Sequence, residues 1–330
     1  MPPLTDTESN QPSRHPVNAP GKATSPVLYS DTVTKVNPAQ AYLLSLNSVR
    51  SRQTMTSFLN IVARILGASD LTDCNWAELR RHHVLALIEL LRDTGLAVAT
   101  VNTYLSALRG VAMEAWMLKL MNVDDYQHIR AVRSVRGSTL PRGRALSREE
   151  IRRLFAMCEA DRSSKGVRDA ALLAVILGCG LRRSEAVALS YEDILPGERA
   201  LKVLGKGNKE RLAYVPAGAW QRLMLWTDQI RGEHPGPLFT RIRRHDFLTE
   251  ERLTDQAVYH ILQVRQQEAD LDKCAPHDLR RTFATALLDN GEDLITVKDA
   301  MGHASVTTTQ KYDRRGEDKL RKARDKIDFD

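Results

Sequence analysis

Apolar residues recur at helical spacing between residue 37 and about residue 130, and this periodicity restricts the possible fold more than any other feature. A spacing of three and four residues places apolar side chains on one helix face. Asn37 and Pro38 indicate a helix start, and Gly67 and Gly95 indicate helix ends. The stripes are Met55, Phe58, Leu59, Val62, Ile65 and Leu66; Val84, Leu87, Ile88 and Leu91; and Val101, Tyr104, Leu105, Leu108, Val111, Ala112 and Ala115. Together they predict a small bundle of four helices.

A basic segment rich in small residues separates this bundle from the rest of the chain. Residues 137–144 read Gly-Ser-Thr-Leu-Pro-Arg-Gly-Arg, a composition typical of flexible linkers. Ser147 and Glu150 follow with the spacing of a capping box, which predicts a new helix start. We therefore predict a helical domain at 37–130, a basic linker at 131–146 and a second domain at 147–330. Residues 1–36 are rich in Pro, Ser and Thr and predict a disordered tail.

The second domain combines helical patterns with one hairpin pattern. Residues 200–204 and 211–215 read as strands, and Gly205-Lys206-Gly207-Asn208-Lys209 between them is typical of a hairpin. The remaining helical patterns cover about 167–178, 183 onward, 217–231, 255–269, 278–290, 294–301, 305–311 and 317–327. The predicted fold class is therefore mainly α with a small β-hairpin, an α+β arrangement.

Charge favours a polyanionic partner. The net charge is +7, and residues 127–148 contain six arginines and no Asp or Glu. A second basic cluster consists of Arg241, Arg243, Arg244 and His245. Such clusters create fields suited to phosphate backbones, although a solvated loop would also tolerate them.

Other sequence features narrow the compartment and the cofactors. The four cysteines are scattered without a Cys-x-x-Cys pair, so neither a zinc site nor a disulfide framework is indicated. The longest apolar run, Ala170 to Leu177, is too short to span a bilayer, and residues 1–22 do not resemble a secretory signal. There is no Walker-type loop and no carboxylate cluster suited to two magnesium ions. We expect a bacterial, cytoplasmic and nucleoid-associated protein that needs no cofactor.

A series of polar residues in the second domain suggests phosphate chemistry. His277 and Arg280 lie three residues apart, so both project from one helix face. That motif alone is weak evidence, because surface His and Arg are often neighbours. Arg182 and Lys206 precede it, and His303 follows it, with Tyr312 nine residues later. The order of these six residues is far more specific than any one of them.

This series resembles the tyrosine recombinase family of phage-type and Xer-like integrases. The resemblance is carried by GLRRSE at 180–185, LGKGNKER at 204–211, HDLRRTFAT at 277–285 and MGHASVTTTQKY at 301–312. A looser match, TVNTYLSALRG at 100–110, lies in the helical domain, which resembles the core-binding domain of the family. The resemblance implies two domains that form a C-shaped clamp around DNA. It also implies catalytic roles for Arg182, Lys206, His277, Arg280, His303 and Tyr312.

Some positions depart from the family pattern or are ambiguous. Arg281 stands where many members have His or Lys, and Met301 stands where Leu is usual. If the match to the family motif were shifted by one motif position, Arg183 and Lys209 would take the places of Arg182 and Lys206. Glu185 reads as a buried partner that positions its helix, not as a base.

The residue types fit transesterification at a phosphodiester. Guanidiniums of Arg182 and Arg280 can bind the nonbridging oxygens through charge-assisted hydrogen bonds, and His303 can donate another. A tyrosine hydroxyl, with a reference pKa of about 10, needs a proton acceptor, and His277 is the best candidate. Lys206 is a candidate general acid for the departing 5′ oxygen. Attack by Tyr312 would give a 3′-phosphotyrosine, so religation would need no ATP.

Candidate DNA contacts lie in both domains. Thr103, Ser106 and Arg109 lie off the apolar stripe of their helix. The other candidates are the basic residues Arg142, Arg144, Arg241, Arg243 and Arg244. Most such contacts would bind phosphates and set position, not sequence specificity.

The resemblance also implies a homotetramer on two synapsed double-stranded DNA sites, with possible accessory DNA-bending proteins. A C-terminal segment at about 316–330 would pass between protomers; a frayed terminal helix is the alternative. The predicted function is site-specific recombination, in the form of integration, excision or resolution. Two alternatives stay open, a type IB topoisomerase-like nicking and closing enzyme and a catalytically silent DNA-binding clamp.

Overall fold

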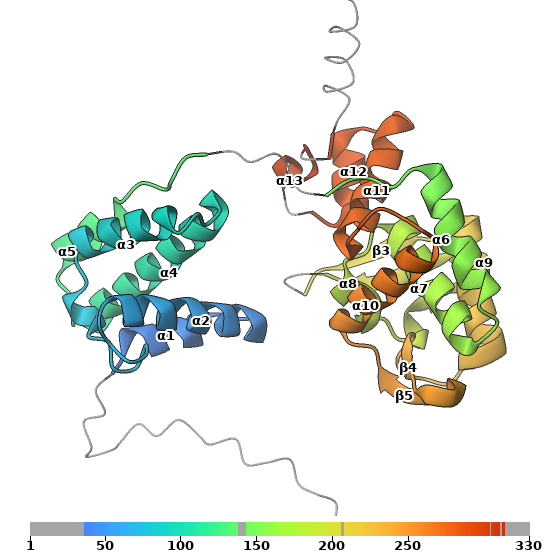
Figure 1. Cartoon of the computed structure of the whole chain (residues 1–330), viewed down its shortest axis with the longest axis horizontal. Helices are drawn as coiled ribbons and strands as arrows, with labels where there is room; N and C mark the ends of the chain where they lie inside the picture. The colour runs from blue at the N-terminus through green and yellow to red at the C-terminus, as the bar shows by residue number, and fades with distance from the viewer. Residues whose placement is uncertain (1–35, 138–142, 206–207, 304, 311, 314–330) are drawn as a thin grey trace, which may run out of the picture. The chain divides into compact units, whose positions relative to one another are not determined.

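The computed structural model describes residues 36–137, 143–205, 208–303, 305–310 and 312–313 of the chain (Figure 1). The chain divides into two compact units, Met1–Thr139 and Leu140–Asp330. Each unit has its own hydrophobic core. Helices predominate and the strands are short and antiparallel, which confirms the mainly α fold class. Within the described ranges, every helix is too short or too polar to cross a membrane.

The first unit is a helical bundle built around its longest helix, α4. The helices are α1 (Pro38–Ser45), α2 (Val49–Ile65), α3 (Arg81–Asp93), α4 (Val98–Met117) and α5 (Val123–Arg130), with a 3-10 turn, η1, at Trp76–Glu78. Helix α4 packs against α1, α2, α3 and α5 through the predicted apolar stripe. The predicted start of α1 is confirmed, because the Asn37 side chain accepts from the backbone N–H of Ala39 at 2.8 Å. The bundle contains α5 in addition to the four predicted helices.

Both ends of the predicted linker pack against the unit that they adjoin. In the first unit, Asn102 exchanges two hydrogen bonds with the backbone of Val135, at 3.1 and 2.9 Å. In the second unit, the backbone N–H of Leu146 donates to Thr282 Oγ1 at 2.8 Å. These contacts involve the two ends of the linker predicted at 131–146, and residues 138–142 between them lie outside the described residues.

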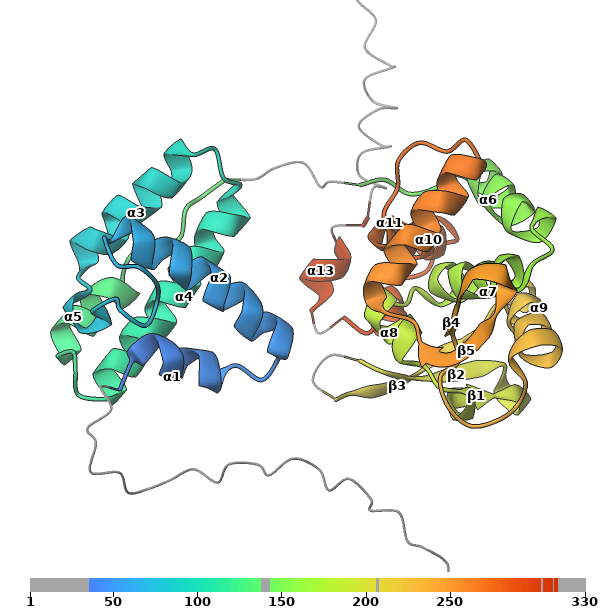
Figure 2. The ribbon, with the colours of Figure 1, turned by 60° about the horizontal axis from the view of Figure 1, so that its bottom comes forward.

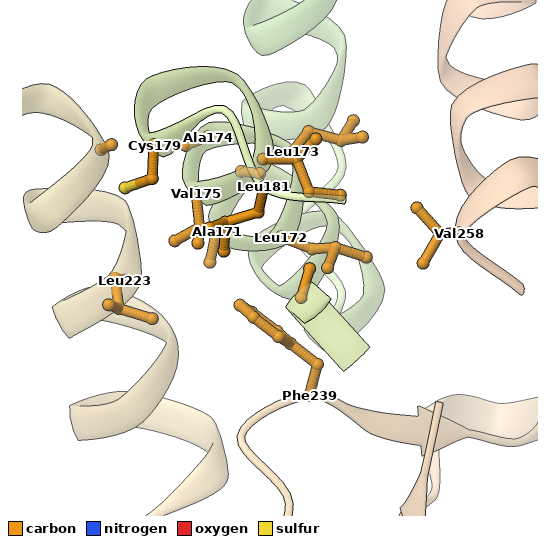
Figure 3. Packing of buried hydrophobic residues seen from close by; sticks show 14 of the residues in the cluster. Ala171, Leu172, Leu173, Ala174, Val175, Cys179, Leu181, Leu223, Phe239 and Val258 are labelled. Carbon is orange, nitrogen blue, oxygen red and sulfur yellow. The ribbon is translucent and has the colours of Figure 1, made fainter. Parts of the chain in front are cut away.

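The second unit has a buried central helix, α7. Its helices are α6 (Arg148–Ala160), α7 (Ser164–Cys179), α8 (Arg183–Ala188), α9 (Ala217–Trp226), α10 (Asp255–Glu268), α11 (Pro276–Asp289), α12 (Leu294–Met301) and α13 (Val306–Gln310). Residues 170–176 of α7 are all buried, because α6, α9 and α11 pack around the helix. Figure 3 shows Leu223 of α9, Val258 of α10 and the loop residue Phe239 around α7. Such burial on every side explains the nearly continuous apolar run of this helix.

Several helix limits follow the sequence closely. The capping box at the start of α6 is confirmed: Ser147 and Glu150 each accept from the other's backbone N–H, at 3.2 and 2.8 Å. The helix predicted at 217–231 is α-helical as far as Trp226 (α9) and continues as a π-helix, η4, over Thr227–Arg231. Residues 1–35 of the tail predicted at 1–36 and the helix predicted at 317–327 lie outside the described residues.

Two small antiparallel sheets complete the second unit (Figure 2). The first has the order β1-β2-β3, from β1 (Ile194–Leu195), β2 (Ala200–Leu204) and β3 (Glu210–Tyr214), with 3-10 turns η2 (Tyr191–Asp193) and η3 (Pro196–Glu198) beside β1. The β2–β3 pair confirms the predicted hairpin, and Leu204 faces Glu210 where it turns. The second sheet, β4 (Thr240–Ile242) with β5 (Leu248–Arg252), was not expected; its connection contains the 3-10 turn η5 (Arg244–Asp246). Its first strand has only three residues, and the second shows no alternation of buried and exposed residues, so the sequence pattern does not reveal the pair.

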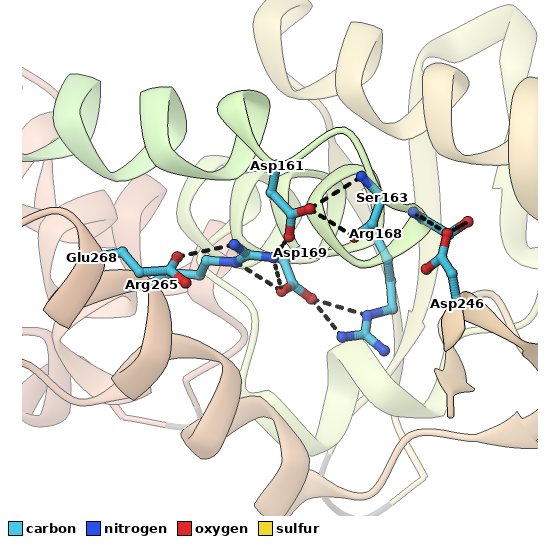
Figure 4. A network of polar contacts seen from close by, with 8 residues as sticks. Asp161, Ser163, Arg168, Asp169, Asp246, Arg265 and Glu268 are labelled. Atoms are coloured by element: carbon cyan, nitrogen blue, oxygen red, sulfur yellow. Dashed lines mark hydrogen bonds and ion pairs between the residues drawn. The ribbon is translucent and has the colours of Figure 1, made fainter. Parts of the chain in front are cut away.

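A buried polar network joins three helices of the second unit (Figure 4). Asp169 of α7 accepts from Arg168 at 2.7 Å and from Arg265 of α10 at 2.9 Å. Arg265 also donates to Asp161, at the end of α6, and to Glu268 at 2.6 and 2.9 Å. The charges compensate one another, which buried ions require. The network fixes α10 and α6 against the central helix.

Candidate active site

Five of the six residues predicted to act in catalysis come together in the second unit. Arg182 caps α8, and His277 and Arg280 lie on α11. His303 lies two residues after the end of α12, and Tyr312 two residues after the end of α13. They are thus contributed by four separate elements that the sequence spreads over about 130 residues. Lys206, the sixth, lies outside the described residues.

The end of α7 positions the first arginine. Gly180 has φ +59°, a left-handed conformation that favours glycine, and it terminates the helix. A Cβ at Gly180 would lie 2.3 Å from Cδ1 of Phe283, so the close packing also requires glycine. The carbonyl oxygen of Gly180 accepts from Arg280 Nη1. The turn after the central helix therefore fixes Arg182 next to Arg280.

A buried carboxylate, Glu185, lies among the guanidiniums. Its Oε1 accepts from Arg182 Nη1 at 2.5 Å, and its Oε2 accepts from Arg211 Nη2 at 2.9 Å and lies 3.9 Å from Arg280 Nη1. Burial by itself would raise the pKa of Glu185, but the hydrogen bonds and charges of the arginines outweigh it and hold the pKa below its usual value. Glu185 is thus an ionised counter-charge that keeps several like charges close together.

The two predicted arginines differ in exposure. The Arg182 side chain is 35% exposed and donates to the carbonyl oxygen of Gly302 at 3.4 Å. The Arg280 side chain is only 2% exposed, and its Nη2 donates to the carbonyl oxygen of Met301 at 2.5 Å. Burial, followed by the charge of Arg182, lowers the pKa of Arg280 to about 10, which leaves it cationic at neutral pH. Arg182 therefore presents an accessible edge, and Arg280 supplies positive charge from beneath.

Tyr312 and His277 are in direct hydrogen-bond contact. The phenol oxygen of Tyr312 lies 2.9 Å from Nε2 of His277, although Tyr312 itself is 5% exposed. Part of the His277 side chain is exposed to solvent. Its pKa is nevertheless lowered, first by desolvation from the surrounding atoms and then by the charges of Arg280 and Arg281. A neutral imidazole at neutral pH has a nitrogen free to accept a proton.

His303 is a buried, neutral imidazole. Its Nδ1 lies 2.9 Å from Thr309 Oγ1, and its ring lies 5.9 Å from the Tyr312 ring, centroid to centroid. Desolvation, then the charges of Arg280 and Arg182, lower the pKa of His303 to about 4. When the Thr309 hydroxyl donates to Nδ1, the proton of His303 is on Nε2, where it is available as a donor.

Arg211 and Thr309 belong to the site but were not predicted from the sequence. A Cβ at Gly302 would lie 3.1 Å from the guanidinium carbon of Arg211, so this arginine packs against the residue before His303. Arg211 is the last residue of the LGKGNKER motif, and this was the signal that the sequence offered. The strand pattern does not show that Arg211 pairs with Glu185. Thr309 is fully buried, and only the fold brings it to His303.

The ambiguity between Arg182 and Arg183 is resolved by their partners, whereas Lys206, the alternative to Lys209, lies outside the described residues. Arg183 pairs with Asp255 at 3.4 Å, on α10, while Arg182 bonds to Glu185 and Gly302. Lys209 is exposed in the hairpin. Arg182 is thus the arginine that belongs to the cluster.

The candidate DNA contacts have varied surroundings. Ser106 is exposed, while the Thr103 hydroxyl donates to the carbonyl oxygen of Ala99 and Arg109 donates to that of Val132. Arg144 pairs with Glu150 at 2.6 Å. The remaining candidates are Arg241 and Arg243, which are exposed and pair with Glu251; Arg244, which is exposed; and Arg142, which lies outside the described residues.

Comparison with known protein families covers both units. Residues 144–318 match the phage integrase family, and residues 40–116 match the phage integrase N-terminal SAM-like domain. Tyrosine recombinase XerC of Staphylococcus carnosus (strain TM300) is 29% identical over 297 residues, which cover 88% of this chain and 96% of the relative. Tyrosine recombinase XerD of Oceanobacillus iheyensis is 32% identical over 242 residues, which cover 72% of this chain and 78% of the relative.

Solved structures show the same fold at lower identity. A lambda integrase dimer bound to a COC' core site has a TM-score of 0.61 and 17% identity, covering 84% of this chain and 77% of that one. XerH site-specific recombinase bound to a difH substrate has a TM-score of 0.55 and 22% identity, covering 83% and 75%. From these matches and the convergent site, the chain belongs to the phage integrase family of tyrosine-type site-specific DNA recombinases.

Proposed function

We propose that Tyr312 cuts and rejoins duplex DNA at specific sites by forming a covalent bond to a backbone phosphate. The observation that carries this proposal is the 2.9 Å contact between the phenol oxygen of Tyr312 and His277 Nε2, next to the charges of Arg182 and Arg280. A nucleophile with a proton acceptor in contact and cations beside it is what attack of a tyrosine on a phosphodiester requires.

The proposed reaction retains the energy of the broken phosphodiester in the new bond between Tyr312 and phosphorus. The phenol proton passes to His277 as the Tyr312 oxygen bonds to phosphorus and the bond to the 5′ oxygen breaks. The product is a 3′-phosphotyrosine and a 5′ hydroxyl, whose oxygen takes a proton from the general acid, for which Lys206 is our candidate. Reversal with a new 5′ end rejoins the strand without ATP.

Charge at the site supports the roles of the other residues. Negative charge on the nonbridging oxygens would be bound by the accessible edge of Arg182 and stabilised by Arg280 beneath it. His303, with its pKa lowered to about 4 by desolvation and neighbouring cations, would donate from Nε2 as a neutral imidazole. All three groups act by stabilising the five-coordinate transition state.

We further propose that the first unit and the basic surface of the second hold the duplex. The contacts would come from Thr103, Ser106 and Arg109 and from the arginines at 142, 144, 241, 243 and 244. The chain would act as a homotetramer on synapsed sites, as in the lambda integrase tetramer bound to a Holliday junction. Exchange of residues 316–330 between protomers, accessory bending proteins and a nucleoid-associated cytoplasmic location belong to the same proposal.

Trapping of covalent adducts tests this function. Wild type and Tyr312→Phe are expressed in bacterial cells, the cells are lysed in SDS, and protein-linked DNA is sequenced. We expect wild type alone to retain DNA, whose ends identify the target site. Retention by both proteins would show that another residue attacks, and discrete sites recovered only without a covalent bond would indicate a silent binder.

A further inference from the structure

Arg281 lies against the nucleophile, although it is not among the residues assigned to the phosphate. It follows Arg280 on α11 and is 5% exposed. Its guanidinium carbon lies 5.2 Å from the centroid of the Tyr312 ring, over the ring face. A guanidinium within about 6 Å of an aromatic face is attracted by the electron-rich ring, most strongly where water is excluded.

Tyr312 depends on such side-chain contacts for its position. The helix before it, α13, has only five residues, and the backbone N–H of Tyr312 makes a single turn contact to Thr309 at 2.9 Å. The ring packs with Ala284, Leu288, Val297 and Met301 and lies 5.9 Å from the His303 ring, centroid to centroid, and the hydroxyl contacts His277. The Arg281 contact therefore completes the set that aims the phenol oxygen at its acceptor.

The charge of Arg281 also acts on the acceptor. His277 is faced by Arg280, Arg281 and Asp278 from α11, by Arg182 before α8, by His303 after α12 and by the Tyr312 phenol after α13. Desolvation, then the cations Arg280 and Arg281, lower the pKa of His277, and Asp278 opposes them. Removal of Arg281 would thus raise the pKa of His277 and leave more of the imidazole protonated.

We propose that Arg281 is a positioning residue for strand cleavage, which holds the Tyr312 ring against His277 and supplies positive charge beside the phenol as it loses its proton. The inference rests on the proposed roles of Tyr312 and His277. Arg281 itself exchanges no proton. The proton moves from Tyr312 to His277 Nε2 while the oxygen–phosphorus bond forms and the bond to the 5′ oxygen breaks.

The first test needs no DNA. The His277 Cε1 proton is followed by NMR against pH in the full chain and assigned by its loss in His277→Gln. In Arg281→Met, an uncharged side chain of similar length, the titration midpoint should move to higher pH; in Arg281→Lys it should stay near wild type. Arg281→Gln serves as a second neutral variant if Arg281→Met does not fold. An unchanged midpoint in a folded neutral variant would refute the proposal, since a purely packing role leaves the midpoint in place.

The second test measures cleavage of the duplex recovered by adduct trapping. Single-turnover adduct formation by Arg281→Met should slow about tenfold near neutral pH, as expected for a disturbed proton transfer. The acidic side of its pH–rate profile should move to higher pH, because His277 must lose its proton to act as acceptor. Wild-type rates across the pH range would overturn the proposal. If wild type forms no adduct either, the proposed function fails, while the NMR titration still decides the role of Arg281.

Discussion

Glu185 is the residue on which the arginine cluster depends. It is 5% exposed and accepts hydrogen bonds from Arg182 and Arg211. Glu185→Gln keeps the shape but removes the charge, so the guanidiniums would repel one another without compensation. We expect a loss of about 3 kcal/mol in the free energy of unfolding at neutral pH, as for broken buried ion pairs. Urea unfolding measures it, and an unchanged midpoint would contradict the prediction.

The pH dependence of that loss gives a further check. The pKa of Glu185 is lower in the folded chain than in the unfolded chain, because the arginine hydrogen bonds and charges outweigh the effect of burial. Its contribution to stability is therefore complete above the unfolded pKa and is lost as the pH falls through the folded pKa. The difference between wild type and Glu185→Gln should accordingly shrink in acid.

Residue identity was predictable where chemistry dictates the residue type. Arg182, His277, Arg280, His303 and Tyr312 stand in recognisable motifs, and the structure brings them together. Their supporting partners were harder to find: Arg211 appears as one more charged strand residue, and Thr309 as one of three threonines in a row. Which of these meets the site depends on tertiary packing, and the sequence does not carry that information locally.

At the scale of elements, the turn after α7 tolerates little change, because Gly180 has a left-handed backbone and a close neighbour. Gly180→Ala would cost about 1–2 kcal/mol for the left-handed backbone alone. The new Cβ would also collide with Phe283, at 2.3 Å. Gly291→Ala is the matched control, because Gly291 has φ +95° and nothing within 4 Å of an added Cβ. We expect Gly180→Ala to be the less stable in thermal unfolding and to lose cleavage activity; equal stability would argue against the close packing.

Elements with a strong local signal were predicted well, and weak ones were not. The capping box of α6 and the β2–β3 hairpin are determined by neighbouring residues, so their patterns were sufficient. The β4–β5 pair has an irregular register, and its first strand has three residues. Its pairing is stabilised by the surrounding fold and leaves little trace in residue order.

At the scale of the whole molecule, the two separate cores should respond separately to mutation. Leu172 and Leu108 are fully buried, one in each unit. Truncation of either to alanine should cost about 2–5 kcal/mol. Hydrogen exchange should show Leu172→Ala loosening amides of the second unit alone, and Leu108→Ala those of the first. Equal loosening of both units by either change would mean that they unfold as one, against the division of the cores.

The two halves of the active site differ in how firmly they are attached. Arg182 follows the most deeply buried helix of its unit, whereas Tyr312 packs in a small separate cluster with Ala284, Leu288, Val297 and Met301. Small clusters with few buried contacts open at lower free energy than a large core, so we expect amides near Tyr312 to exchange faster than those of α7. In this enzyme the first phosphate-binding arginine is therefore anchored to the main core, and the nucleophile to a much smaller one.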